Sequence, residues 1–202
     1  AEHAKQLAAM LPQEEMIAFS PQECRKQCIF EISDAEIKAG EAVILRGVSL
    51  RVMRGERLAV VGENGCGKST LLKFIAESLQ GEAVSYLSQQ CEDVCGTPAQ
   101  YAAAWGIDEA SFKSMLAKLG FRRTDWDKDM SLLSTGQRKK AALARSLLTK
   151  ARLYLWDEPF NYLDIPAREM IEDAIIASSP TMVFVEHDAA FVSRVATRIF
   201  QI

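Results

Sequence analysis

A glycine-rich stretch carries the residue types and spacing of a phosphate-binding loop. Its residues fit the pattern G-x-x-x-x-G-K-[ST] at Gly62, Gly67, Lys68 and Ser69. Glycines let the backbone curl so that several N–H groups point at phosphate oxygens, and a helix that starts there adds partial positive charge. The alternative is a glycine-rich turn that binds nothing. Because an apolar run at 58–61 precedes the stretch and a helical pattern follows it, we predict that it binds a nucleoside triphosphate.

Each residue type in this stretch has a defined use. The lysine places a full charge on the outer phosphates, and the Ser69 hydroxyl is a ligand for Mg²⁺. The residues expected to surround the phosphates are Gly62, Glu63, Asn64, Gly65, Cys66, Gly67, Lys68, Ser69 and Thr70.

An acidic pair ends a second apolar strand pattern. Asp157 and Glu158 follow four apolar or aromatic residues at 153–156. If this strand end faces the phosphate loop, Asp157 holds Mg²⁺ through water and Glu158 orients the attacking water. Such a pair is also common as a solvated strand end. Together with the phosphate loop it predicts hydrolysis, because that reaction needs a cation to spread charge and a base to align water.

Two further polar residues follow strand patterns. Gln89 comes after 82–88 and is expected to sense Mg²⁺ or water. His187 comes after 181–185 and is expected to bond the γ-phosphate. A lone histidine is more often a structural residue. Here it ends a strand expected to be parallel to the one that carries Asp157, which is where open α/β sheets place their ligands.

A second possible anion site starts another helix. Ser134, Thr135, Gly136 and Gln137 precede a helical pattern. They are either a simple helix cap or a set of exposed backbone N–H groups that bind an anion. Since the first loop already surrounds a phosphate, the second site is expected to serve another domain's nucleotide. The basic cluster at 138–140 that follows is either a solvated helix face or an RNA contact.

The elements that must position these residues alternate between strand and helix. We predict strands at 28–37, 43–52, 58–61, 82–88, 153–157, 181–185 and 197–202. We predict helices at 69–79, 97–105, 108–119, 132–148, 166–176 and 189–195. The pattern indicates an α/β fold with a mixed sheet, an N-terminal antiparallel β subdomain and a helical subdomain inserted at about 91–150.

Composition limits the alternatives. The 202 residues suffice for one substantial domain, and a net charge of −3 argues against a large nucleic-acid surface. No apolar run approaches the roughly 20 residues that span a bilayer.

Five cysteines without a signal peptide indicate reduced thiols in the cytoplasm. Two C-x-x-x-C pairs leave zinc half-sites as an alternative, although neither has C-x-x-C spacing. Cys66 is either an oxidation-sensitive thiol or a small filler.

Six ordered motifs together resemble the ATP-binding cassette (ABC), a family built on the P-loop NTPase core. They are the Walker A loop at 62–69, the Q-loop at Gln89, the signature at 133–137, Walker B with its catalytic glutamate at 153–158, the D-loop with Asn161, Leu163 and Asp164, and the switch histidine His187. The resemblance covers the chain from about residue 29 onward. It implies ATP and Mg²⁺ as cofactors.

The resemblance also implies roles for these residues. The catalytic residues it implies are Glu158, His187 and Lys68, the metal ligands are Ser69, Gln89 and Asp157, and the signature residues for the ATP of a partner domain are Ser134, Thr135, Gly136 and Gln137. Two departures stand out. Thr135 occupies a position where glycine is common, and 37–43 lacks the aromatic residue on which cassettes stack adenine. Such stacking is worth roughly 1–3 kcal/mol.

Within the superfamily the chain is most similar to the second, C-terminal nucleotide-binding domain of ABC-F proteins. These are cytoplasmic tandem-cassette ATPases that act on ribosomes without membrane insertion. The passages at 136–140, 155–164 and 186–191 are similar to the branch that protects bacterial ribosomes from antibiotics. The resemblance implies that 1–22 is the remnant of the interdomain linker and that 23–202 is the nucleotide-binding domain. The implied partners are the other cassette of the same full-length chain and, through the linker, ribosomal RNA.

Two other functions remain open at this stage. The same catalytic motifs serve the energy subunit of a membrane ABC transporter, whose membrane partner would bind the helical subdomain. A regulatory module that binds nucleotide without hydrolysis is the third reading, against which the intact acidic pair and histidine argue. In either enzymatic reading the isolated domain is expected to hydrolyse ATP weakly, because cassettes complete each other's sites.

Overall fold

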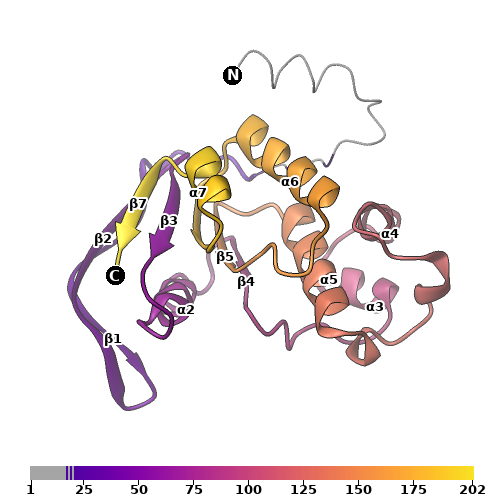
Figure 1. The fold of residues 1–202 in the computed structure, drawn as a ribbon, viewed down its shortest axis with the longest axis horizontal. Coiled ribbons are helices and arrows are strands. Elements are labelled where there is room, and N and C mark those ends of the chain that lie inside the picture. The colour runs from indigo at the N-terminus through magenta and orange to yellow at the C-terminus, as the bar shows by residue number, and fades with distance from the viewer. Residues whose placement is uncertain (1–16, 18, 20) are drawn as a thin grey trace. The chain divides into compact units, whose positions relative to one another are not determined.

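The computed structural model describes residues 17, 19 and 21–202. The helix end predicted at 1–16 lies outside the described residues, as does most of the predicted linker remnant at 1–22. The chain divides into two compact units. The sheet unit comprises 21–89, 150–159 and 179–202, and the helical unit comprises 90–149 and 160–178 together with the described residues before 21 (Figure 1).

A five-stranded parallel sheet forms the centre of the sheet unit (Figure 1). In spatial order its strands are β4 (Val84–Leu87), β5 (Leu153–Asp157), β6 (Met182–Val185), β3 (Arg57–Val61) and β7 (Arg198–Gln201). Every residue of β5 and β6 is buried, which explains their continuous apolar runs, because a parallel sheet is covered on both faces. All five carboxyl ends therefore meet at one edge.

Two helices of the sheet unit follow the strands that carry chemistry. Helix α2 (Lys68–Ser78) follows β3, and α7 (Ala189–Val195) follows β6. Helix α2 contacts β1, β5 and β6 and contributes three fully buried side chains to the core, namely Leu71, Leu72 and Ile75. This packing fixes the direction in which the start of α2 points.

The antiparallel strands form a separate hairpin in the same unit. Strand β1 (Cys28–Ala39) pairs with β2 (Ala42–Met53), and Ile37 and Val52 are fully buried in the common core. The predicted fold class is confirmed, with one refinement: the antiparallel and parallel strands lie in two sheets rather than in one mixed sheet. The pattern of residues could not show this, because sheet membership depends on backbone pairing between distant segments.

The helical unit contains four helices in its described part. These are α3 (Pro98–Ala104), α4 (Glu109–Lys118), α5 (Thr135–Leu148) and α6 (Ile165–Ser178), with short 3₁₀ turns at Arg123–Asp125 and Met130–Leu132. Helix α4 is capped by Asp108, the first residue of the helix predicted at 108–119, whose carboxylate accepts from the Ser111 N–H at 2.8 Å. The prediction that one helix spans 132–148 is wrong at its start. A 3₁₀ turn ends at Leu132, and α5 begins only after its cap residue, Ser134.

Two buried side chains of the helical unit, Arg145 and Tyr101, share polar and ring contacts. The Arg145 side chain is 3% exposed and lies 4.1 Å from the ring centre of Trp105, and its Nε lies 4.0 Å from Asp93. The Tyr101 hydroxyl donates to the same carboxylate at 2.8 Å, and burial raises the pKa of Tyr101 far above its ordinary value. Both the guanidinium and the phenol are therefore partnered inside the unit.

Among the described residues, no helix has the length and apolar character that crossing a bilayer requires.

Candidate nucleotide-binding site

The phosphate loop connects β3 to α2 through three glycines with positive φ. At Gly67, φ is +105°, and an added Cβ would lie 2.8 Å from Cγ2 of Ile44. At Gly62 an added Cβ would lie 2.8 Å from the carbonyl oxygen of Ile202. Only glycine fits at these two positions, because a side chain at either one would clash. The loop thus has the tight curl that the sequence predicts.

The start of α2 is left without a side-chain cap. Gly67 is the N-cap residue, and no side chain accepts a hydrogen bond from the first turn. The first N–H groups of a helix have no partner inside the helix. They are therefore oriented to bind an anion at this end of α2.

Lys68 is folded across its own loop. Its side chain is buried, and its Nζ donates to the carbonyl oxygens of Gly62 at 2.9 Å and Glu63 at 2.8 Å. These contacts place the ammonium group over the glycine-rich curl. A phosphate in the loop would be within reach of this charge.

The acidic pair lies at the same edge of the sheet as the loop. Asp157 ends β5 and is 1% exposed, and Glu158 follows it with φ +49°. The Glu158 N–H donates to the Val185 carbonyl at 3.0 Å, which ties the end of β5 to the end of β6. A left-handed conformation at a residue other than glycine is strained, and such strain is frequent at functional sites.

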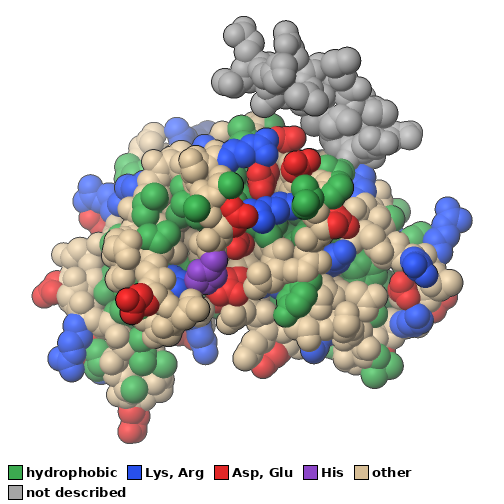
Figure 2. Space-filling model, in the orientation of Figure 1, with side chains coloured by type: hydrophobic (Ala, Val, Ile, Leu, Met, Phe, Trp, Pro, Cys, Tyr) green, Lys and Arg blue, Asp and Glu red, His purple; other side chains and the backbone are tan. Residues whose placement is uncertain are grey.

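Residues from three strand ends meet on the Glu158 carboxylate. Gln89 Nε2 donates to Glu158 Oε2 at 3.0 Å, and His187 Nε2 lies 3.3 Å from Glu158 Oε1. The sequence predicted each of these residues separately, as a partner of metal, water or phosphate. The structure brings them together around one carboxylate, which fixes its orientation. The His187 side chain is half exposed. Figure 2 shows a histidine side chain at the surface of this face, next to acidic and basic side chains.

A cavity of about 430 Å³ lies between the phosphate loop and α7. Gly62, Lys68 and His187 line it, and so does Glu186, which sequence reasoning missed. Glu186 Oε1 accepts from the His187 N–H at 2.9 Å, so it holds the backbone of the histidine. The signal was available, because Glu186 directly follows β6 and is a carboxylate next to the predicted histidine.

The signature residues form a second cavity, within the helical unit. It measures about 580 Å³ and is lined by Ser134, Thr135, Gly136, Gln137, Lys140 and Tyr162. An added Cβ on Gly136 would lie 2.9 Å from Cβ of Tyr162, so glycine is needed here for close packing. The sequence did not single out Lys140 or Tyr162 for this site. Tyr162 lies in the D-loop, distant in sequence, and only the fold brings it to Gly136.

The remaining D-loop residues lead into α6. The Asp164 carboxylate accepts from the Ala167 N–H at 3.0 Å, and the Leu163 N–H donates to the Phe160 carbonyl at 3.1 Å. Asn161 is exposed. Asp164 therefore has a structural use as a helix cap, whatever else it contacts.

Comparison with known proteins identifies the family. A family model described as "ABC transporter" matches residues 45–161, which is more than half of the chain. The chain is 32% identical over 180 residues to "ABC transporter F family member 2" of Arabidopsis thaliana, covering 80% of this chain and 26% of that protein. It is 28% identical over 179 residues to "Ribosome protection protein VmlR" of Bacillus subtilis, covering 81% of this chain and 32% of that protein.

Other matches concern a single cassette. The chain is 33% identical over 178 residues to "Cytochrome c biogenesis ATP-binding export protein CcmA" of Hyphomonas neptunium, covering 80% of this chain and 91% of that protein. A solved dimeric ATP-binding cassette, MJ0796 bound to ADP and Pi, aligns with TM-score 0.70 at 19% identity, covering 85% of this chain and 93% of that chain, which shows the fold alone.

The predicted resemblance to ATP-binding cassettes with ABC-F relatives is confirmed, whereas the C-terminal position and the resistance branch stay predictions. The chain spans only about a quarter to a third of the length of the first ABC-F relatives. The family's ATPase domains bind ATP, typically with Mg²⁺. With the phosphate loop and acidic pair at one sheet edge, and with this match, the chain belongs to the ABC transporter family of ATP-binding cassette domains.

Proposed function

We propose that the chain is the second, C-terminal cassette of a cytoplasmic tandem ABC-F ATPase that acts on the ribosome and protects it from antibiotics. Two kinds of observation support this. Relatives named as ABC-F members are about 30% identical over four-fifths of the chain, and one relative is named a ribosome protection protein. The chain covers only 26% of the length of one such relative, as expected if it is one of two cassettes in a longer protein.

The observation that carries the hydrolytic part is the fixed Glu158 carboxylate. It lies at the edge of the sheet from which the phosphate loop leaves β3, and Gln89 and His187 both contact it. In this proposal Glu158 accepts a proton from the water that attacks the γ-phosphate. His187 holds the γ-phosphate, and Lys68 moves its hydrogen bonds from the loop carbonyls to the phosphate oxygens.

The donor set fits Mg²⁺. The Ser69 hydroxyl, the Gln89 amide oxygen and the Asp157 carboxylate are hard oxygen ligands, the kind that Mg²⁺ prefers. Asp157 is buried at the end of β5, so its carboxylate is held in place. In this family the metal, when bound, draws charge from the bridge between the β- and γ-phosphates.

Full turnover in this proposal needs a second cassette. The cavity at Ser134, Gly136 and Lys140 is proposed to receive the γ-phosphate side of the nucleotide held by that cassette, with Thr135 and Gln137 beside it. The D-loop residues Asn161, Leu163 and Asp164 are proposed to lie at the same junction. The isolated chain is therefore expected to bind ATP but to hydrolyse it slowly.

Replacing the proposed base tests the assignment. In the full-length protein, Glu158→Gln is expected to lower kcat about 10²–10⁴-fold, because a positioned general base contributes that much. ATP affinity is expected to stay near the wild-type value, since the amide keeps the size of the carboxylate. Glu77→Gln, on the exposed side of α2, is the matched control and should change neither quantity. A steady-state phosphate-release assay in which Glu158→Gln keeps wild-type kcat would refute the role of Glu158.

The second candidate is the ATP-binding subunit of a membrane transporter. The match to CcmA favours it, because the chain covers 91% of that single-cassette protein. The catalytic chemistry is the same, so the surrounding chain and genes must decide. A second cassette encoded upstream in the same gene supports the ABC-F proposal, whereas a neighbouring gene for a membrane permease supports the transporter.

A further inference from the structure

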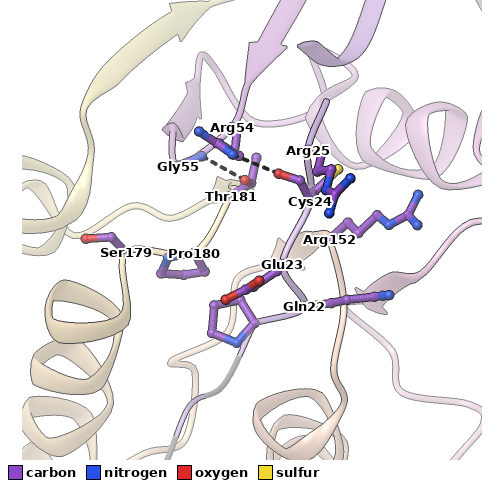
Figure 3. Close-up of a pocket in the computed structure, with 11 residues that line it drawn as sticks. Gln22, Glu23, Cys24, Arg25, Arg54, Gly55, Arg152, Ser179, Pro180 and Thr181 are labelled. Carbon is purple, nitrogen blue, oxygen red and sulfur yellow. Dashed lines mark hydrogen bonds between the residues drawn. The ribbon is translucent and has the colours of Figure 1, made fainter. Parts of the chain in front are cut away.

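A second large pocket of the sheet unit lies away from the phosphate loop (Figure 3). It has a volume of about 650 Å³. Its lining residues come from the segment before β1 and from the residues just before β3, β5 and β6: Gln22, Glu23, Cys24, Arg25, Arg54, Gly55, Arg152, Ser179, Pro180 and Thr181, with Pro21. It therefore lies at the amino ends of the parallel strands. The proposed ATP site lies at their carboxyl ends.

The pocket is basic although the chain as a whole is acidic. Three guanidinium groups line it, from Arg25, Arg54 and Arg152, against one carboxylate, from Glu23. The net charge of the chain is −3. In Figure 3 the guanidinium groups of Arg25 and Arg152 point to the same side of the segment, whereas the Glu23 carboxylate points to the other side. Glu23 therefore does not neutralise these two groups, and of the two only Arg152 is paired with another carboxylate of the described residues, that of Glu82.

The three arginines have few protein partners. Arg54 Nη1 donates to the Cys24 carbonyl at 2.9 Å, and neither Arg54 nor Arg25 forms an ion pair with any described residue. Arg152 is partly exposed, and its Nη1 forms an ion pair with Glu82 Oε2 at 3.3 Å. The guanidinium groups of Arg25 and Arg54 therefore offer N–H donors that no carboxylate of the described residues occupies.

Hydrogen bonds donated by backbone N–H groups hold the walls of the pocket. The Gly55 N–H donates to Thr181 Oγ1 at 2.8 Å, which joins the turns before β3 and β6 (Figure 3). The Arg152 N–H donates to the Ala83 carbonyl at 2.7 Å, and the Gln22 N–H donates to the Ala151 carbonyl at 2.9 Å. The backbone that carries Arg152 and the segment before β1 are therefore fixed relative to the sheet.

We infer that this pocket binds a phosphate-bearing anion at a site separate from the ATP site. Guanidinium groups match phosphate oxygens with paired, charge-assisted hydrogen bonds. The phosphates of an RNA backbone and those of a free oligophosphate present the same chemistry to the three arginines. This inference does not depend on ATP hydrolysis by the chain.

Inorganic pyrophosphate, followed by amide-resolved NMR on the 202-residue chain, tests the site. We expect saturable shifts at the amides of Gly55, Arg152 and Thr181. These signals are separate from those of the phosphate loop, which pyrophosphate can also occupy. Arg25→Gln and Arg152→Gln should each weaken binding at the pocket about tenfold, because a hydrogen bond to a charged group is worth at least that much.

Arg46→Gln is the matched control, because Arg46 is an exposed arginine of β2 that pairs with Glu36 outside the pocket. It should leave the pocket affinity unchanged. Arg25 is exposed and forms no hydrogen bond or ion pair with another described residue, so its replacement does not threaten folding. Shifts confined to the phosphate loop, or a pocket affinity that survives both pocket substitutions, would overturn the inference while leaving the proposed ATPase function intact.

A single-stranded RNA oligonucleotide distinguishes the two sources of phosphate. If RNA is the ligand, fluorescence anisotropy should show binding that weakens with salt, and each arginine removed should reduce the slope of log K against log salt by about 0.7. Binding of pyrophosphate without binding of RNA assigns the pocket to a free oligophosphate. Absence of both at the pocket rejects the site.

Discussion

Two helix starts of the molecule were predicted to bind phosphate, and they are built in opposite ways. Helix α2 begins after Gly67, which has φ +105° and offers no side-chain cap. Helix α5 begins after Ser134, whose Oγ accepts from the Gln137 N–H at 3.3 Å, while Gln137 Oε1 accepts from the Ser134 N–H at 3.2 Å. The first start is open, and the second is closed by a capping box.

The presence or absence of a side-chain cap determines how the start of α2 and the start of α5 can each bind an anion. At α2 no side-chain cap competes with an anion for the first N–H groups, and the adjacent Lys68 adds a positive charge. At α5 the side chains already satisfy two of the N–H groups, so an anion must displace or supplement them. The open start is therefore suited to hold a nucleotide on its own. The closed start is suited to contact a phosphate that is already bound elsewhere, as the proposed second cassette would present it.

Removing the charge at the open start gives the largest expected effect. Lys68→Met keeps an unbranched side chain one atom shorter but removes the hydrogen bonds to phosphate, so the ATP affinity of the chain should fall about 10²-fold. Lys73→Met, in the same helix, removes an exposed lysine whose nearest carboxylate is Glu77 at 3.9 Å, and it should leave affinity unchanged. Calorimetric titration with Mg·ATP measures both. Equal affinities for the two variants would mean that Lys68 does not hold the phosphates.

Removing the cap of the closed start gives a smaller effect. Ser134→Ala should lower the free energy of unfolding by about 1 kcal/mol, the usual value of a cap. Thr97→Ala is the matched control, because Thr97 forms the same capping box at α3. Urea unfolding should show similar losses for both.

Ser134→Ala and Thr97→Ala should differ in their rates of ATP hydrolysis. In the full-length protein Ser134→Ala should also slow hydrolysis about tenfold through one lost charge-assisted hydrogen bond, whereas Thr97→Ala should not. If both variants keep wild-type hydrolysis, Ser134 is only a helix cap and the proposed contact with a second nucleotide is wrong.

Local patterns in the sequence predicted most of the elements. The apolar runs of β3, β5 and β6 and the cap at Ser134 are signals within a few neighbouring residues. The start of α5 was predicted too early, because the apolar residues before Ser134 fit helical spacing but belong to a 3₁₀ turn.

Contacts between segments that are far apart in the chain could not be predicted from local sequence patterns. The grouping of α6 with α3, α4 and α5, the contact of Tyr162 with Gly136 and the three arginines around one pocket join segments far apart in the chain. Motif spacing predicted that Gln89 and His187 would lie near nucleotide. It gave no indication that both contact Glu158, because that contact depends on the order of the strands in the sheet.

The uncapped start of α2 is proposed to bind the phosphates of a nucleoside triphosphate. Titration of the folded chain with Mg·ATP, followed at the backbone amides of Gly65, Gly67 and Ser69, tests it directly. We predict saturable shifts at these amides, together with shifts at Glu158 and His187 across the sheet edge. A titration that leaves the loop amides unmoved in a folded chain would contradict the account.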